Sequence, residues 1–112
     1  MVEVRITLAL REQVFRIFKE QSYEIFDRFK SLEQQPQKGK AVGHVDNIVI
    51  KELKDGKYRF YFITDGHILK FGSPEEIAQL LIKFVRMSEK KDQPQIIAEV
   101  KRILQSMGFD GL

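Results

Sequence analysis

Residues 54–66 hold the side chains of this chain that are best suited to chemistry. They read Lys-Asp-Gly-Lys-Tyr-Arg-Phe-Tyr-Phe-Ile-Thr-Asp-Gly, so two Asp-Gly turn signals enclose a run that alternates like a β-strand. On such a strand the aromatic residues at 58, 60 and 62 face a core, while Arg59 and Tyr61 face the other way. A rigidly held guanidinium is a ready phosphate ligand, and a phenol beside it can stack on a base or hydrogen-bond to it. RNA or DNA is therefore the first partner to consider.

Basic side chains gather in three clusters along the chain. The clusters are Lys51, Lys54, Lys57 and Arg59; Lys83, Arg86, Lys90 and Lys91; and Lys101 with Arg102. A solvated surface is the ordinary explanation for such charges, because acidic residues lie close to them in the sequence. The functional alternative is a basic groove that holds nucleic-acid phosphates. Clustered Lys and Arg can also stabilise a pentacoordinate phosphorane and activate an attacking 2′-hydroxyl, with neither metal nor histidine.

Other catalytic chemistries find little support in the residue types. The chain has no cysteine, which excludes disulfides and thiolate metal sites. Its two histidines, His44 and His67, are isolated, and we expect both at the surface or at a strand edge. Neither a glycine-rich phosphate loop nor a Ser-His-Asp arrangement occurs. We therefore expect no metal and no cofactor.

The composition indicates one globular domain over residues 1–112. With 43% hydrophobic and 31% charged residues, the chain can bury a modest core. No apolar run reaches the roughly 18 residues that a membrane span needs, and charges stand where a signal peptide would be apolar. We therefore expect a cytoplasmic protein with no membrane partner. The net charge of +3 is a mild excess and does not by itself indicate nucleic-acid binding.

Hydrophobic periodicity predicts an α+β fold. The expected elements are an N-terminal strand at 2–6, a helical hairpin at about 8–19 and 22–34, a linker at 34–43, strands at 48–53, 57–64 and 67–71, and a C-terminal helix at 92–108. Thr7 suits the N-cap of the first helix, because its hydroxyl can accept a hydrogen bond from a free amide of the first turn. Pro36 stops the helical hairpin, and the Asp-Gly pairs make the later strands an antiparallel meander.

Residues 73–88 fit two structures. Ser73, Pro74 and Glu76 have the spacing of a helix start with a capping box, and the apolar residues that follow keep helical spacing. Residues 80–87 are also an apolar, β-branched run of strand length. Periodicity alone leaves both alternatives open.

Four segments follow one another in a distinctive order. Residues 4–7 lead into the helical hairpin, and residues 35–40 read Gln-Pro-Gln-Lys-Gly-Lys. Residues 52–62 read Glu-Leu-Lys-Asp-Gly-Lys-Tyr-Arg-Phe-Tyr-Phe, and residues 84–94 read Phe-Val-Arg-Met-Ser-Glu-Lys-Lys-Asp-Gln-Pro. This order resembles the RelE/ParE superfamily of toxin–antitoxin toxins, with its Pro-x-x-Gly-Lys linker and its Glu-Leu-Arg … Tyr-Arg-x-x-Tyr-Phe core. The last segment is similar to the Phe-Val-Lys-Lys-Ser-x-Lys-x-x-Pro stretch of the HigB-like, phage-derived branch.

The resemblance implies a RelE-like fold and a function. In such a fold residues 73–79 would be a short inserted helix and 80–87 the last strand. Many members are ribosome-associated endoribonucleases (mRNA interferases), and a cognate antitoxin neutralises them in a hetero-oligomer. The alternative is a non-catalytic RelE/ParE-fold toxin or binding module that acts on a protein target such as gyrase. A nucleic-acid-binding domain of unrelated fold is a third possibility.

The resemblance also implies roles for particular residues. Arg59 matches the arginine that binds the scissile phosphate, and Lys54 and Arg86 match cations with acid/base or charge-stabilising roles. The expected catalytic group is Lys54, Arg59, Arg86 and Lys90, and the expected nucleic-acid-binding residues around it are Lys51, Lys57, Tyr61, Lys83 and Lys91.

Overall fold

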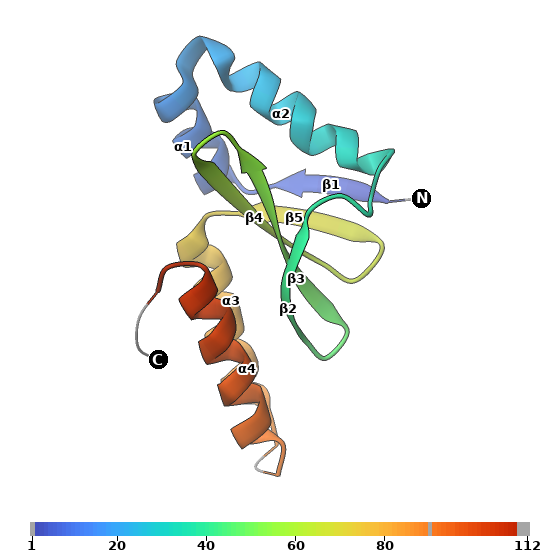
Figure 1. Ribbon diagram of the computed structural model, residues 1–112, viewed down its shortest axis with the longest axis vertical. Helices are drawn as coiled ribbons and strands as arrows, with labels where there is room; N and C mark the ends of the chain where they lie inside the picture. Colours follow the sequence, from blue (N-terminus) through green and yellow to red (C-terminus); the bar gives the residue numbers. More distant parts are fainter. Residues whose placement is uncertain (1, 90, 110–112) are drawn as a thin grey trace.

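A five-stranded mixed sheet with helices on both sides forms the protein (Figure 1). The computed structural model describes residues 2–89 and 91–109. In chain order its strands and α-helices are β1 (Glu3–Ile6), α1 (Leu8–Phe18), α2 (Ser22–Lys30), β2 (Lys40–Val45), β3 (Ile48–Asp55), β4 (Tyr58–Thr64), β5 (Ile68–Gly72), α3 (Pro74–Met87) and α4 (Gln93–Ser106). Short 3₁₀ helices at Lys19–Gln21 and Ser31–Glu33 follow α1 and α2.

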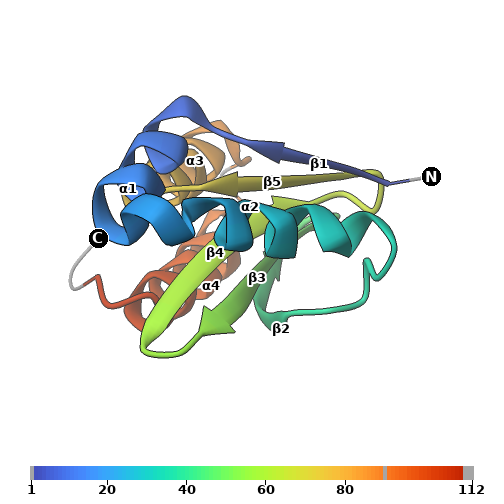
Figure 2. The same cartoon turned by 90° about the horizontal axis from the view of Figure 1, so that it is seen from above.

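The strands lie in the order β1-β5-β4-β3-β2. β2 to β5 form an antiparallel meander, and β1 returns to pair in parallel with β5. α1 and α2 cover one face of the sheet, and α3 and α4 cover the other (Figures 1 and 2). β1 and β2 are therefore the two edges of the sheet, and β4 lies at its centre.

Each face of the sheet has its own hydrophobic core. The first core joins β1, β3, β4 and β5 to α1 and α2, and the second core joins β2, β3 and β4 to α3 and α4. Successive side chains of a strand point to opposite faces, so β4 contributes to both. Phe60 and Phe62 are buried in the first core, and Tyr61 is buried in the second beside Leu81 and Ile103.

The structure confirms the predicted α+β fold and most of its elements. The N-terminal strand, the helical hairpin, the antiparallel meander and the C-terminal helix lie close to their predicted places. His44 and His67 are both exposed, as expected. Within the described ranges, no helix combines the length and the apolar character that crossing a bilayer requires.

Residues 80–87 are helical, so the prediction of a last strand there is wrong. α3 is continuous, and the predicted short helix at 73–79 is only its beginning. Helical spacing prevails because it buries Ile77 and Leu81 together against the sheet while Gln79 between them stays exposed. In addition, β5 pairs with β4 on one side and with β1 on the other, so residues 80–87 have no open edge of β5 to join.

Residues 40–45 form β2, where the sequence predicted the end of a linker. β2 is an edge strand that pairs with β3, and the register shifts between Ala41 and Gly43. Among its side chains only that of Val45 is buried. The strand therefore lacks the apolar alternation that a sequence pattern detects, and its pairing with β3 holds it in place.

Gly43 lets α4 lie directly against β2. A Cβ at this position would meet Ile103 Cγ1 at 2.6 Å, Arg102 Nη2 at 2.5 Å and Glu99 Oε1 at 2.7 Å. The ends of the arginine and glutamate side chains can swing away, but Ile103 is fully buried in the second core. The absence of a side chain at Gly43 therefore sets how closely α4 approaches the sheet.

One carboxylate ties the start of α3 to the start of α1. Ser73 and Glu76 form a capping box, in which Glu76 N donates to Ser73 Oγ (3.2 Å) and Ser73 N donates to Glu76 Oε1 (2.9 Å). Thr7 Oγ1 donates to the same Glu76 oxygen (2.7 Å) and, as the N-cap of α1, accepts from Leu10 N (3.2 Å). Burial alone would raise the pKa of Glu76, but these hydrogen bonds outweigh it and hold the pKa below its ordinary value.

We predict that Gly43→Ala destabilises the protein by about 2 kcal/mol, because Ile103 has to move out of a packed position. Gly72→Ala is the matched control, since Gly72 is also a strand glycine and its added Cβ would meet nothing closer than 3.4 Å. The control should cost less than about 1 kcal/mol. Equilibrium unfolding in urea measures both, and equal losses would contradict the packing argument.

We predict that Glu76 makes part of the stability depend on pH. Because its pKa is lower in the folded state than in the unfolded state, its stabilisation is complete above the unfolded value and is lost as the pH falls through the folded value. The free energy of unfolding of wild type minus that of Glu76→Gln should therefore shrink from about pH 7 to about pH 3. Glu75→Gln, at the exposed neighbouring position, serves as the control. A wild-type advantage that stays constant over this range would disprove the assignment.

Candidate anion-binding site

A cavity of about 630 Å³ opens beside β2. Residues of β2, β3 and β4, together with residues of α2 and α4, form its walls. Its charged lining consists of five cations, Arg28, Lys40, Lys54, Arg59 and Arg102, and one carboxylate, Glu52. We call this hollow the basic cavity.

The register of β3 and β4 brings Lys54 and Arg59 together. The two residues are directly paired across the antiparallel strands, and Glu52 shares their face because it precedes Lys54 by two positions. Arg59 Nη1 lies 3.9 Å from Glu52 Oε2. The Glu52 side chain is 10% exposed and the Arg59 side chain 52%. A guanidinium therefore lies near a carboxylate that is partly shielded from water, and the Lys54 side chain lines the same cavity.

Arg102 connects α4 to β2 at the wall of the basic cavity. Its Nη2 donates to Val42 O at 2.8 Å and to Glu99 Oε1 at 2.6 Å, and its Nε donates to Glu99 Oε2 at 3.2 Å. The same hydrogen-bonded pair raises the pKa of Arg102 and lowers that of Glu99. The guanidinium is therefore held in one place between α4 and β2.

The basic cavity carries an excess of positive charge. Arg28 lies 3.2 Å from Asp55, and Arg59 and Arg102 have the carboxylate partners described above. In the part of the chain that the structure describes, no carboxylate makes an ion pair with Lys40 or Lys54. Two ammonium groups and three guanidinium groups around one hollow favour a phosphate or another oxyanion.

Lys51 and Lys57 lie outside the basic cavity. Lys51 is on the opposite face of β3, where its Nζ donates to Gln37 O (3.1 Å) and lies 5.9 Å from the centre of the Phe62 ring. Burial lowers the pKa of Lys51. Lys57 lies in the turn between β3 and β4, with its Nζ 5.5 Å from the centre of the Tyr58 ring. These two predicted nucleic-acid-binding residues therefore lie on the β3–β4 hairpin but do not line the cavity.

Tyr61 is buried, so its ring offers little surface on which a base could stack. Its residue is 4% exposed and packs in the second core under α3 and α4. Burial, reinforced by the charge of Glu52, raises the pKa of the phenol. The sequence argument took the Arg59 face of β4 to be open, whereas α3 and α4 cover the middle of that face.

The remaining predicted cations belong to α3 and the residues after it. They are Lys83 and Arg86, both exposed on α3, the exposed Lys91, and Lys90, which lies outside the described residues. Figure 1 shows the C-terminal end of α3 at the bottom of the molecule and the turn between β3 and β4 in its upper half. The structure therefore unites Lys54 with Arg59 and does not bring Arg86 to them.

The residues expected to be catalytic or to bind nucleic acid did not include four charged residues of the basic cavity: Arg28, Lys40, Glu52 and Arg102. Of these, only Arg102 belonged to one of the three basic clusters. The position of Glu52 two residues before Lys54 was an available signal, because such residues share a strand face. Lys40 fell in the predicted linker, and its pairing with Glu52 across β2 and β3 appears only in the structure. No local pattern relates Arg28 or Arg102 to Arg59, because helix packing alone brings them together.

The arrangement is suited to binding oxyanions and to moving a proton beside them. Lys54 and Arg59 can hold a phosphate, and the Glu52 carboxylate can accept a proton from a group next to it. Among residues 2–89 and 91–109, no three His, Asp or Glu side chains cluster so that they could hold a metal ion.

Comparison of the chain with protein-family models, with curated proteins and with solved structures gives no significant match.

We predict that inorganic polyphosphate binds in the basic cavity. Lys54→Glu should weaken binding about tenfold, because it removes a cation from the wall of the cavity and adds a charge that repels the ligand. Lys101→Glu is the matched control, since it makes the same charge change at an exposed site of α4 outside the cavity. Its effect should stay below about twofold. Isothermal titration calorimetry at one ionic strength measures both, and equal losses would point to net charge alone.

Proposed function

We propose that this protein is a type II toxin of the RelE/ParE kind, which binds mRNA in the basic cavity and cuts it on the ribosome. The observation that carries the proposal is the position of Glu52 beside Lys54 and Arg59 in a cavity with excess positive charge. The order of the sequence motifs, from the N-terminal strand through the Pro-x-x-Gly-Lys linker to β4, supports the same class.

In the proposed reaction Arg59 and Lys54 hold the scissile phosphate and stabilise the negative charge that develops on its oxygens. Glu52 accepts the proton of the ribose 2′-hydroxyl, and the freed oxygen attacks phosphorus. The bond from phosphorus to O2′ forms as the bond to O5′ breaks, and the Lys54 ammonium gives its proton to the leaving oxygen. The products are a 2′,3′-cyclic phosphate and a 5′-hydroxyl end.

The other cations of the basic cavity have a place in the same proposal. Lys40 on β2, Arg28 on α2 and Arg102 on α4 surround the phosphate position from three separate elements. They would bind the phosphates on either side of the one that is cut. The proposed enzyme thus needs no cation from the far end of α3, where Arg86 lies.

The proposed class brings a partner and a compartment with it. A cytoplasmic toxin of this kind is neutralised by a cognate antitoxin, which covers the basic surface in a toxin–antitoxin hetero-oligomer. The excess charge of Lys40 and Lys54 would suit an acidic segment of that antitoxin.

A second candidate is a non-catalytic toxin of the same class that acts on a protein target such as gyrase. The C-terminal helices favour this alternative, because α3 and α4 bury the sheet face around Tyr61. That cover narrows the surface on which RNA could lie and leaves the basic cavity as its open part.

We predict that expression of the protein without a partner arrests growth and produces cleaved mRNA. Arg59→Glu should abolish both effects, because the phosphate loses its guanidinium ligand. Glu52→Gln should keep RNA affinity within about threefold and slow cleavage by about a hundredfold or more, since the amide cannot accept the 2′-hydroxyl proton. Primer extension on translated mRNA measures cleavage, and fluorescence anisotropy with a short RNA measures affinity.

Lys101→Glu serves as the control and should remain toxic. A harmless wild-type protein that cuts no mRNA would refute the ribonuclease. Growth arrest without cleavage, together with inhibition of gyrase supercoiling in vitro, would establish the second candidate instead.

A further inference from the structure

β1 leaves one backbone edge of the sheet unpaired. Of the strands that the structure describes, β5 alone pairs with it. Glu3 N donates to His67 O at 2.9 Å on that paired side. Because backbone groups alternate in direction along a strand, the N–H and C=O groups of Val4 and Ile6 point away from the sheet.

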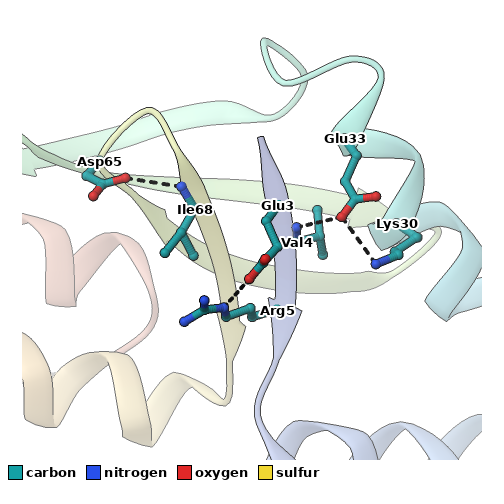
Figure 3. Close-up of polar contacts among 7 residues, drawn as sticks. All are labelled: Glu3, Val4, Arg5, Lys30, Glu33, Asp65 and Ile68. Carbon is teal, nitrogen blue, oxygen red and sulfur yellow. Dashed lines mark hydrogen bonds and ion pairs between the residues drawn. The ribbon is translucent and has the colours of Figure 1, made fainter. Parts of the chain in front are cut away.

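The side chain of Glu33 hydrogen-bonds to part of this unpaired edge. Val4 N donates to Glu33 Oε2 at 2.9 Å, and Lys30 Nζ donates to the same oxygen at 3.2 Å (Figure 3). These hydrogen bonds, with that of Val4 first, lower the pKa of Glu33, so the carboxylate is charged at neutral pH. Glu33 Oε2 thus occupies the position that a carbonyl oxygen of one further strand would have.

An aromatic hollow of about 340 Å³ lies beside the same edge. We call it the β1 groove, and its apolar lining is Val4, Ile6, Phe15, Tyr23 and Phe26. Phe15 is 46% exposed and Tyr23 70% exposed, although both are large side chains. The Phe15 ring meets Tyr23 and Phe26 edge to face, with centroids 6.3 and 5.1 Å away. Exposed aromatic side chains next to an open strand edge are typical of a surface that binds an extended chain.

The charges at the rim of the β1 groove select the occupant. Arg11, Asp27 and Lys30 line it. Glu33 pairs with Lys30 at present, so an occupant that displaces Glu33 faces two cations and one carboxylate. An acidic side chain in the incoming segment restores the balance.

We propose that β1 accepts an additional strand from a partner polypeptide, and that Glu33 is displaced when this strand binds. The segment carries apolar residues at alternate positions and an acidic residue at its end. A carbonyl of the segment accepts the hydrogen bond that Val4 N now donates to Glu33. The apolar side chains of the segment, about 7 Å apart along one face, cover Phe15 and Tyr23. The acidic side chain of the segment forms the ion pair with Lys30 in place of Glu33.

A second copy of this chain does not fit the same description. Its own β1 has no free apolar side chain to offer at the centre, because Val4 is 6% exposed and belongs to the first core. The proposed site lies at the opposite edge of the sheet from the basic cavity, so it stands or falls independently of the proposed function.

The test uses a probe peptide, acetyl-Glu-Thr-Ile-Thr-Ile-Thr-Glu-amide, which offers the pattern in either chain direction. Titration into ¹⁵N-labelled protein should shift the amide signals of Val4 and Ile6 and slow the hydrogen exchange of Ile6. A peptide of the same composition with its two isoleucines adjacent is the control and should bind at least about tenfold more weakly, because only one apolar side chain can then face the groove.

Substitutions separate the edge from the groove. Glu33→Ala should tighten peptide binding about fivefold, because the displaced hydrogen bond no longer competes. Phe15→Ser and Tyr23→Ser should each weaken it about tenfold. Ile17→Ser, at a 43% exposed position on the same helix but outside the groove, and Lys54→Glu, in the basic cavity, should leave it unchanged.

Three outcomes would overturn the proposal. The first is no shift at Val4 or Ile6 at millimolar peptide, and the second is equal affinity for the control peptide. The third is a dimer of the free protein in sedimentation that Tyr23→Ser dissociates, because the occupant would then be a second copy.

Discussion

The whole structure depends on a sheet whose central strand, β4, is buried on both faces. β4 places Phe60 and Phe62 in one core and Tyr61 in the other, so each face of the sheet needs its own helical cover. The α1–α2 hairpin and the α3–α4 pair supply these covers, and burial of large side chains by both is the main gain of folding. A charge on β4 is tolerated only near the end of the strand. The basic cavity, with Arg59 in its wall, lies where the cover of α4 ends and β2 begins.

The elements that sequence predicts well are those whose own residues contain the signal. The Asp-Gly turns place β3, β4 and β5, and the apolar stripe places the first two helices. Residues 80–87 could not be assigned in this way, because the same apolar run satisfies a strand and a helix. The capping box of Ser73 and Glu76 and the occupation of the β5 edge by β1 decide for the helix. β2 escaped notice because an edge strand can be held by backbone pairing with few buried side chains.

The same distinction between local signals and distant contacts applies to the residues of the candidate site. Lys54 and Arg59 could be predicted, because they belong to one hairpin and strand alternation puts them on one face. The burial of Tyr61 could not, since it depends on whether distant helices cover that face. Lys40 and Arg102 join the site through the pairing of β2 and the packing of α4 on Gly43, and neither contact leaves a local trace in the sequence.

The separation of the two cores along the chain has a consequence for the order of events during synthesis. The first core is made wholly from residues that precede α3, whereas the second core requires both α3 and α4. Because a ribosome delivers the N-terminal part first, β1 to β5 can pair with their first helical cover while Ile50 and Tyr61 are still bare. The nascent chain therefore passes through a stage in which helices cover one face of the sheet and the other face exposes apolar side chains. That stage ends only when residues 74–106 have emerged. Until then the exposed apolar face of the sheet is a binding surface for a molecular chaperone.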